Sequence, residues 1–202
     1  MLDYEIERDL TEKGYSAVCG VDEAGRGPLC GPVVAAACIL PLGFEMPELN
    51  DSKKLTPKKR EKLFDLICEN AIAYCIAEAS VEEIDRLNIL EADLLAMRRA
   101  IDGLAVKADF ALIDGNIARD FQIPARAVIH GDAISPSIAA ASILAKVTRD
   151  RACEELDRAY PQYGIAKHKG YGTKAHMDAL RTYGPSPSHR KQFIRFLDKE
   201  TL

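Results

Sequence analysis

Four acidic residues stand at or just past the ends of apolar runs in this sequence. Asp22 and Glu23 follow AVCGV, Asp114 follows FALI, and Asp132 follows RAVIHG. Aspartate is disfavoured in strands and costly beside buried apolar surface. One such residue alone is usually a turn or capping residue. If the strands are neighbours in a sheet, however, their ends bring all four carboxylates into one small volume.

This acidic cluster predicts a metal site. Four like charges cannot all stay ionised at close range without cations. Hard divalent ions with oxygen ligands, Mg²⁺ or Mn²⁺, are the natural partners. Two such ions suit phosphoryl transfer, because one helps to activate water and the other stabilises the leaving oxygen.

A glycine-rich segment, Gly25-Arg26-Gly27, follows the first acidic pair directly. Glycines allow backbone N–H groups to approach a ligand closely. The spacing G-R-G-P-L-C-G misses the dinucleotide pattern G-x-G-x-x-G by one residue, and the chain has no G-x-x-x-x-G-K-S/T motif. A dinucleotide-binding or P-loop protein therefore lacks its motif here.

Charge is distributed unevenly along the chain. The formal net charge is −4, yet between Gln162 and Arg195 seven basic residues face one acidic residue, a local balance of +6, so the other residues carry −10. A basic C-terminal quarter on an acidic chain is a candidate surface for a polyanion. A solvated helical face is the competing interpretation of the same charges.

Composition indicates an ordinary globular protein. The chain has 202 residues, of which 48% are apolar and 29% charged, which fits one folded domain and excludes a disordered chain. No apolar run approaches the roughly 18 residues of a membrane span, and the acidic start MLDYEIE has no signal-peptide core. Six cysteines without a Cys-x-x-Cys pair predict reduced, mostly buried thiols in a cytoplasmic protein.

The apolar pattern also predicts the elements that position these residues. We expect helices over 3–13, 57–70, 81–103 with a break near Asn88, and 136–160, and strands over 17–22, 32–40, 71–80, 109–114 and 125–130. This order favours a mixed α/β sheet covered by helices. Functional residues are then expected at one end of the sheet, where neighbouring strands stop.

Several distinctive sequence blocks occur along nearly the whole chain. They are DEAGRGP at 22–28, DSKKL at 51–55, LIDG at 112–115, GDA at 131–133, SIAAASILAKVTRD at 137–150, YG at 163–164 and KHKGYGT at 167–173. In this order, the blocks resemble those of the type 2 ribonucleases H, the bacterial ribonuclease HII family. One departure is His130, which stands where the family commonly has a lysine before Gly-Asp.

The resemblance implies a ribonuclease H-like α/β fold, a five-stranded mixed sheet flanked by helices, with a helical C-terminal region. Residues 1–202 would form one catalytic domain, of which about 160–202 is a basic substrate-binding region. The implied enzyme is an endonuclease that cuts the RNA strand of RNA/DNA hybrids. It also nicks duplex DNA 5′ of a single ribonucleotide, leaving 5′-phosphate and 3′-hydroxyl ends.

The resemblance also assigns roles to particular residues. Two divalent ions, Mn²⁺ or Mg²⁺, would be held by the four catalytic carboxylates, Asp22, Glu23, Asp114 and Asp132. The Gly-Arg-Gly segment, Gly25, Arg26 and Gly27, would read the 2′-OH of the ribonucleotide, the group that distinguishes RNA from DNA. Tyr171 would pack on the sugar of the next nucleotide.

Other candidate substrate contacts come from residue type and spacing. Lysines are candidate phosphate contacts, here Lys53, Lys54, Lys167 and Lys169. Ser142 and Lys146 are one turn apart on the long predicted helix and share a face. For His168, His176 and His189 we expect surface roles, and for Tyr163 a structural one.

Three alternatives remain open on the sequence alone. A binding module of the same fold without catalysis is disfavoured because all four carboxylates are present. A small-molecule phosphatase is disfavoured by the basic C-terminal quarter and by the Gly-Arg-Gly segment. The related ribonuclease HIII carries a large N-terminal domain, for which Asp22 lies too near the start. The expected partners are therefore RNA/DNA hybrids and ribonucleotide-containing DNA, bound by a monomer without membrane association.

Overall fold

The computed structural model describes residues 2–49, 52 and 55–197. Its elements, in chain order, are α1 (Glu5–Glu12), β1 (Val18–Ala24), β2 (Val33–Ile39), α2 (Pro57–Asn70), β3 (Ala73–Ala79), α3 (Val81–Leu87), α4 (Ile89–Asp102), β4 (Phe110–Asp114), β5 (Ala125–Val128), the 3-10 helix η2 (Gly131–Ala133), α5 (Pro136–Ala159), the 3-10 helix η3 (Pro161–Tyr163), α6 (Ile165–His168) and α7 (Lys174–Tyr183).

The five strands form one mixed sheet in the order β3-β2-β1-β4-β5. The β1–β2 and β2–β3 pairs are antiparallel, whereas the β1–β4 and β4–β5 pairs are parallel. The predicted five-stranded mixed sheet is confirmed. Because β1, β4 and β5 run in the same direction, their carboxyl ends meet at one edge of the sheet.

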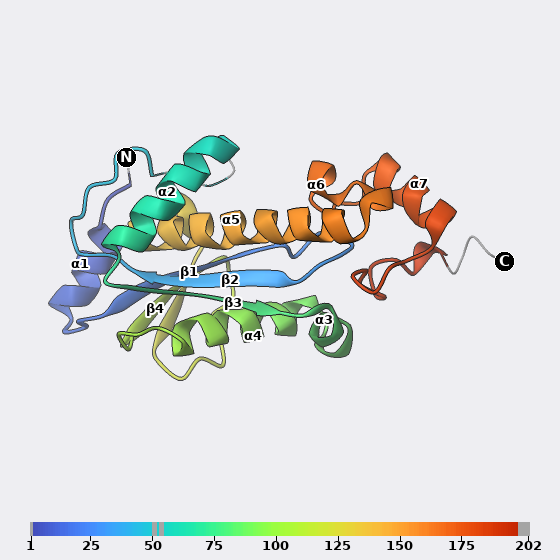
Figure 1. Cartoon of the computed structure of the whole chain (residues 1–202). Helices are drawn as coiled ribbons and strands as arrows, with labels where there is room; N and C mark the ends of the chain where they lie inside the picture. Colours follow the sequence, from blue (N-terminus) through green and yellow to red (C-terminus); the bar gives the residue numbers. More distant parts are fainter. Residues whose placement is uncertain (1, 50–51, 53–54, 198–202) are drawn as a thin grey trace.

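Helices cover both faces of the sheet. In Figure 1, α2 and α5 lie on one face and α4 lies on the other. The interior strand β2 is accordingly buried at all seven positions, as expected for a strand covered on both sides. The small residues Ala139, Ala140 and Ala141 of α5 are fully buried, which allows this helix to approach the sheet closely.

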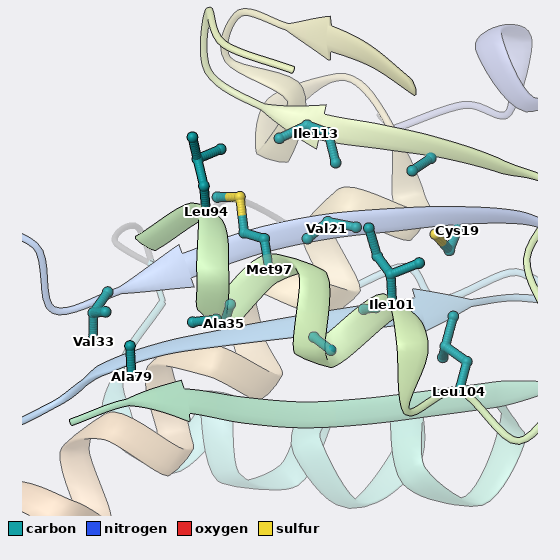
Figure 2. Packing of buried hydrophobic residues seen from close by; sticks show 14 of the residues in the cluster. Cys19, Val21, Val33, Ala35, Ala79, Leu94, Met97, Ile101, Leu104 and Ile113 are labelled. Atoms are coloured by element: carbon teal, nitrogen blue, oxygen red, sulfur yellow. The ribbon is translucent and has the colours of Figure 1, made fainter. Parts of the chain in front are cut away.

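The face below the sheet is held by apolar side chains of α4. Leu94, Met97 and Ile101 follow helical spacing and point at the sheet, where they meet Val21 and Ile113 (Figure 2). Burying each such side chain stabilises the fold by about 1.5–3 kcal/mol. This layer keeps β1 and β4 side by side, and these two strands carry three of the four acidic candidates.

Two element boundaries can be compared directly with the predicted ones. The predicted break near Asn88 is confirmed: Asn88 has φ +77, and its side chain accepts hydrogen bonds from the N–H groups of Leu90 and Glu91 at the start of α4. β1 runs to Ala24, further than predicted, because its last residues pair with β2. Asp22 and Glu23 therefore lie within the strand and not past it.

The C-terminal helices α6 and α7 lie beyond the sheet, at the C-terminal end of α5 (Figure 1). Their main apolar contacts form a separate small cluster that includes Cys30, Cys153, Ile165 and Leu180. In the described part of the chain, every helix is too short or too polar to span a membrane.

Candidate active site

The strand register brings the four acidic residues together. Val21 pairs with Ile113 across parallel strands, so Asp22 and Asp114 emerge next to each other at the carboxyl edge. Asp114 Oδ1 then accepts hydrogen bonds from the N–H groups of Gly131 (2.7 Å) and Asp132 (3.4 Å). These two bonds join the segment after β5 to the end of β4.

The electrostatics of this cluster show mutual repulsion. Burial, followed by the charges of Glu23 and Asp114, raises the pKa of Asp22 well above its usual range, and Asp132 adds to the effect. Burial also raises the pKa of Glu23, against the opposing charge of Arg26. Four oxygen-donor side chains in a shared, largely buried volume suit a hard divalent cation, which would relieve this repulsion.

A groove of about 340 Å³ runs beside the carboxylates and collects most of the residues proposed to contact substrate. Its lining includes Asp22, Glu23, Gly25, Arg26, Gly27, Ser142, Lys146, Lys169 and Tyr171. Lys167 is exposed on α6 and does not line this groove. Lys53 and Lys54 lie outside the described residues.

Gly27 and Tyr171 are neighbours in the lining of the groove. A Cβ atom on Gly27 would stand 3.2 Å from Cε1 of Tyr171, so only glycine leaves the ring undisturbed at this position. Tyr171 is 52% exposed, which leaves its ring free to meet a ligand. Gly25 has φ +104, a backbone conformation that residues other than glycine rarely adopt.

Charged and hydroxyl groups complete the groove wall. Lys146 Nζ lies 2.6 Å from Asp150 Oδ1, and Lys169 Nζ lies 3.5 Å from Glu154 Oε1. Ser142 is buried and donates a hydrogen bond to Ser52 Oγ (2.8 Å). The two lysines are thus present with their charges already balanced by carboxylates.

A fifth acid, Asp93 on α4, was not anticipated from the sequence. Arg26 bridges it to the acidic cluster, because Nε lies 3.5 Å from Asp93 Oδ2 and Nη1 lies 3.6 Å from Glu23 Oε1. Asp93 is buried and its Oδ1 has no partner in the described structure. Burial and the charge of Glu23 raise its pKa to about 8. The available signal was an acidic residue on the apolar face of a helix.

The surface role expected for His176 and His189 is wrong, because both residues are buried. Ser186 N–H donates to His189 Nδ1 (3.0 Å), which places the proton of a neutral His189 on Nε2. That proton faces His176 Nε2 (3.0 Å), and His176 Nδ1–H donates to the carbonyl oxygen of Tyr171 (3.0 Å). This chain of hydrogen bonds fixes the backbone of Tyr171 through its carbonyl oxygen. The predicted structural role of Tyr163 is confirmed, because its ring is buried beside His189.

Cys30 lies near both buried histidines, and the Sγ atom and imidazole nitrogens of the three residues lie within 4.8 Å of one another. The hydrogen-bonded chain described above gives each imidazole nitrogen of His176 and His189 a partner without a metal ion. We therefore interpret the cluster as structural.

The buried histidines predict a loss of stability in mild acid. Burial, reinforced by His176, lowers the pKa of His189 to about 4, and burial also lowers the pKa of His176. The unfolded chain takes up these protons near pH 6.5, but the folded chain does so only at lower pH. Stability is therefore lost as pH falls from about 6.5 towards 4, and His189 alone accounts for about 2 kcal/mol between pH 7.5 and pH 5.

Urea unfolding at the two pH values measures this effect. In His189→Gln the decline is expected to be smaller by the contribution of the lost imidazole. An equal decline in the variant and the native chain would show that other groups cause it.

Comparison with known proteins identifies first the class and then the family. The solved structure of ribonuclease H2 from Pyrococcus horikoshii OT3 superposes with a TM-score of 0.73 at 29% sequence identity, covering 92% of this chain and 98% of that one. The fold is thus ribonuclease H-like, as predicted. The family model for ribonuclease HII matches residues 19–197.

Curated relatives agree with this assignment. Ribonuclease HII of Desulfitobacterium hafniense (strain DSM 10664 / DCB-2) is 58% identical over 187 residues, covering 93% of this chain and 72% of that protein. Ribonuclease HII of Burkholderia thailandensis is 58% identical over 176 residues, covering 87% and 82%. The chain belongs to the ribonuclease HII family. It is a ribonuclease H, a hydrolase acting on RNA/DNA hybrids, and the ribonuclease H family depends on divalent metal.

Proposed function

We propose that this ribonuclease H, besides cutting the RNA strand of hybrids, nicks duplex DNA on the 5′ side of a single embedded ribonucleotide. Cleavage leaves 5′-phosphate and 3′-hydroxyl ends. The observation that supports this most strongly is that Gly27 and Tyr171 lie side by side in the lining of the groove that also contains Asp22 and Glu23. A backbone that meets one nucleotide and a ring that meets the next can sense a ribonucleotide followed by DNA.

The second part of the proposal concerns the metal. Asp22, Glu23, Asp114 and Asp132 would hold two divalent ions, Mg²⁺ or Mn²⁺. Bound there, the ions would supply activation of the attacking water and stabilisation of the leaving oxygen. The repulsion that raises the pKa of Asp22 supports this assignment.

The chain itself positions these groups and the substrate. Hydrogen bonds from the N–H groups of Gly131 and Asp132 orient the Asp114 carboxylate. Arg26 limits the position of Glu23 through their ion pair. Lys146 and Lys169 can exchange their carboxylate partners for backbone phosphates as the duplex enters the groove, which makes binding sensitive to salt.

The C-terminal region supplies one wall of the groove through Lys169 and Tyr171. We assign residues of about 160–202 to substrate binding within a single catalytic domain of residues 1–202. The protein would act as a cytoplasmic monomer. Six free cysteines, four of them buried, suit a reducing compartment.

Replacing Tyr171 tests the junction-sensing role. Base or sugar stacking on an aromatic ring is worth about 1–3 kcal/mol, so Tyr171→Ala should lower kcat/KM on a single-ribonucleotide duplex about tenfold more than on a long RNA/DNA hybrid. Stability should hardly change, because the ring is half exposed. Steady-state kinetics on both substrates measures the difference.

Tyr183→Ala is the matched control, since Tyr183 is also exposed in the C-terminal region but does not line the groove. It should leave the ratio of the two activities unchanged. Equal losses on both substrates in Tyr171→Ala would remove Tyr171 from junction sensing.

A further inference from the structure

Arg190 is a fully buried residue that no sequence motif singled out. Its guanidinium donates five hydrogen bonds, and every acceptor is a backbone carbonyl oxygen of the segment that follows β1. The acceptors are Gly25 (2.6 Å), Arg26 (2.9 Å), Pro28 (2.9 Å), Gly31 (2.9 Å) and Pro32 (3.2 Å). One side chain near the C-terminus thus binds five carbonyl groups of a loop in the N-terminal half of the chain.

Two further bonds complete this arrangement. The backbone N–H of Arg190 donates to the Leu29 carbonyl (2.8 Å), and Arg149 Nη2 donates to the Cys30 carbonyl (2.8 Å). Of the eight carbonyls from Gly25 to Pro32, seven therefore accept a hydrogen bond, six from Arg190 and one from Arg149. The loop is wrapped around a buried cationic centre.

This wrapping determines where the N–H groups of the loop point. In a trans peptide the N–H of a residue is antiparallel to the carbonyl of the preceding residue, and the described chain has no cis peptide bonds. Because the carbonyls of Gly25 and Arg26 point at Arg190, the N–H groups of Arg26 and Gly27 point away from it. Neither N–H group donates a hydrogen bond to any described residue, and both residues line the groove.

Only an arginine can make this set of contacts. A planar guanidinium presents five N–H donors in a fixed fork, whereas a lysine ammonium presents three donors at one point. No ion pair of the described residues includes Arg190, and all five N–H donors of its guanidinium are bonded to carbonyl oxygens. The Phe193 ring adds a cation–π contact, with its centroid 5.3 Å from the guanidinium carbon.

We propose that Arg190 is a positioning residue for substrate recognition: it turns the Gly25 and Arg26 carbonyls inward so that the N–H groups of Arg26 and Gly27 are presented to the ribose 2′-OH. The inference rests on the proposed nicking at single ribonucleotides. It makes the C-terminal segment part of the recognition loop, because the residue that sets the loop conformation comes from that segment.

Arg190→Lys tests the proposal, because it keeps the charge and loses the fork. A misplacement of about 1 Å at a reacting centre costs roughly 100-fold in rate, and a loss of that order in kcat/KM is expected on a DNA duplex with one ribonucleotide. Affinity is the second readout, measured with Ca²⁺ in place of Mg²⁺. The preference for the single-ribonucleotide duplex over the same all-DNA duplex should fall towards unity.

Leu180→Ala is the control for a purely structural role, since Leu180 is buried in the same C-terminal region but donates nothing to the loop. It should lower the unfolding temperature and keep the native affinity ratio. If Arg190→Lys is folded and also keeps the native ratio, the proposal is wrong.

Phe193→Leu serves if Arg190→Lys does not fold. This variant retains the guanidinium but removes the ring beneath it, and a smaller fall in the affinity ratio is expected. A native ratio in Phe193→Leu beside an unfolded Arg190→Lys would contradict the proposal and leave Arg190 as a residue needed only for folding. The unaltered chain is tested first on the single-ribonucleotide duplex. If it does not nick this duplex, the proposed function is wrong, and this outcome is distinct from a failure of the role given to Arg190.

Discussion

Asp114→Asn is expected to abolish cleavage of RNA/DNA hybrids while the protein still folds and binds them. Asparagine can accept the same hydrogen bonds from the N–H groups of Gly131 and Asp132, so the local backbone should persist. What disappears is one negative oxygen ligand of the proposed metal site. Loss of several kcal/mol of transition-state stabilisation corresponds to at least about a 1,000-fold fall in kcat.

Asp120→Asn provides the matched control for this experiment. Asp120 is exposed in the loop after β4 and has φ +62, a conformation that asparagine tolerates well. Cleavage rates and hybrid affinity should remain near those of the native chain. If Asp114→Asn retained near-native turnover, the assignment of Asp114 as a metal ligand would be wrong.

Gly20→Ala is expected to have the largest effect on stability among the glycine-to-alanine replacements in this chain. A Cβ on Gly20 would lie 2.1 Å from the carbonyl carbon and 2.5 Å from the carbonyl oxygen of Ser137, and 2.2 Å from the nitrogen of Ile138. These are backbone atoms of α5, so the clash can be relieved only by lifting the helix from β1. We expect a loss of more than about 4 kcal/mol, a large part of a typical folding free energy.

Gly43→Ala is the control for a glycine replacement without this clash. Nothing lies within 4 Å of a Cβ at Gly43, although its φ of +81 still penalises alanine, by about 1–2 kcal/mol. Urea unfolding of both variants measures the contrast. A Gly20→Ala protein as stable as Gly43→Ala would show that α5 and β1 are not packed as closely as the structure has them.

The local sequence pattern predicted the fold well for helices and strands whose formation depends mainly on their own residues. The alternation of apolar runs with polar segments identified all five strands and the long helix α5, and the register of parallel β1 and β4 then brought Asp22 and Asp114 together. The carboxylate cluster could be predicted because strand ends are local features. Its consequence, the crowding that raises the pKa of Asp22, needs only that these ends are neighbours.

Residues whose role depends on distant contacts could not be predicted in this way. Arg190 looked like one basic residue among seven, and its partners lie more than 150 residues earlier in the chain. His176 and His189 were interpreted as surface residues because nothing local shows that the C-terminal helices enclose them. Lys167 has the same motif context as Lys169, yet only Lys169 lines the groove. Lys167 lies within α6, whereas Lys169 follows the helix with a left-handed backbone, φ +53.

Asp93 illustrates a different limit. The apolar residues around Asp93 predict a helical face that is buried. Nothing in the local sequence pattern explains why an acidic residue lies on that face. Only the position of Arg26, which reaches from the groove to Asp93, accounts for a carboxylate at that place. The role of an acidic residue on a buried helical face therefore depends on which loop lies beside that helix in the folded protein, and the sequence pattern does not show this.

The central claim is that the groove recognises one ribonucleotide within DNA and cuts beside it with divalent metal. The most direct measurement incubates a DNA duplex carrying one ribonucleotide with the protein and Mg²⁺, Mn²⁺ or EDTA. A nick on the 5′ side of the ribonucleotide with either metal, and none with EDTA, is the predicted result. Cleavage of a long RNA/DNA hybrid without any nick in this duplex would contradict the roles given to Gly25, Arg26, Gly27 and Tyr171.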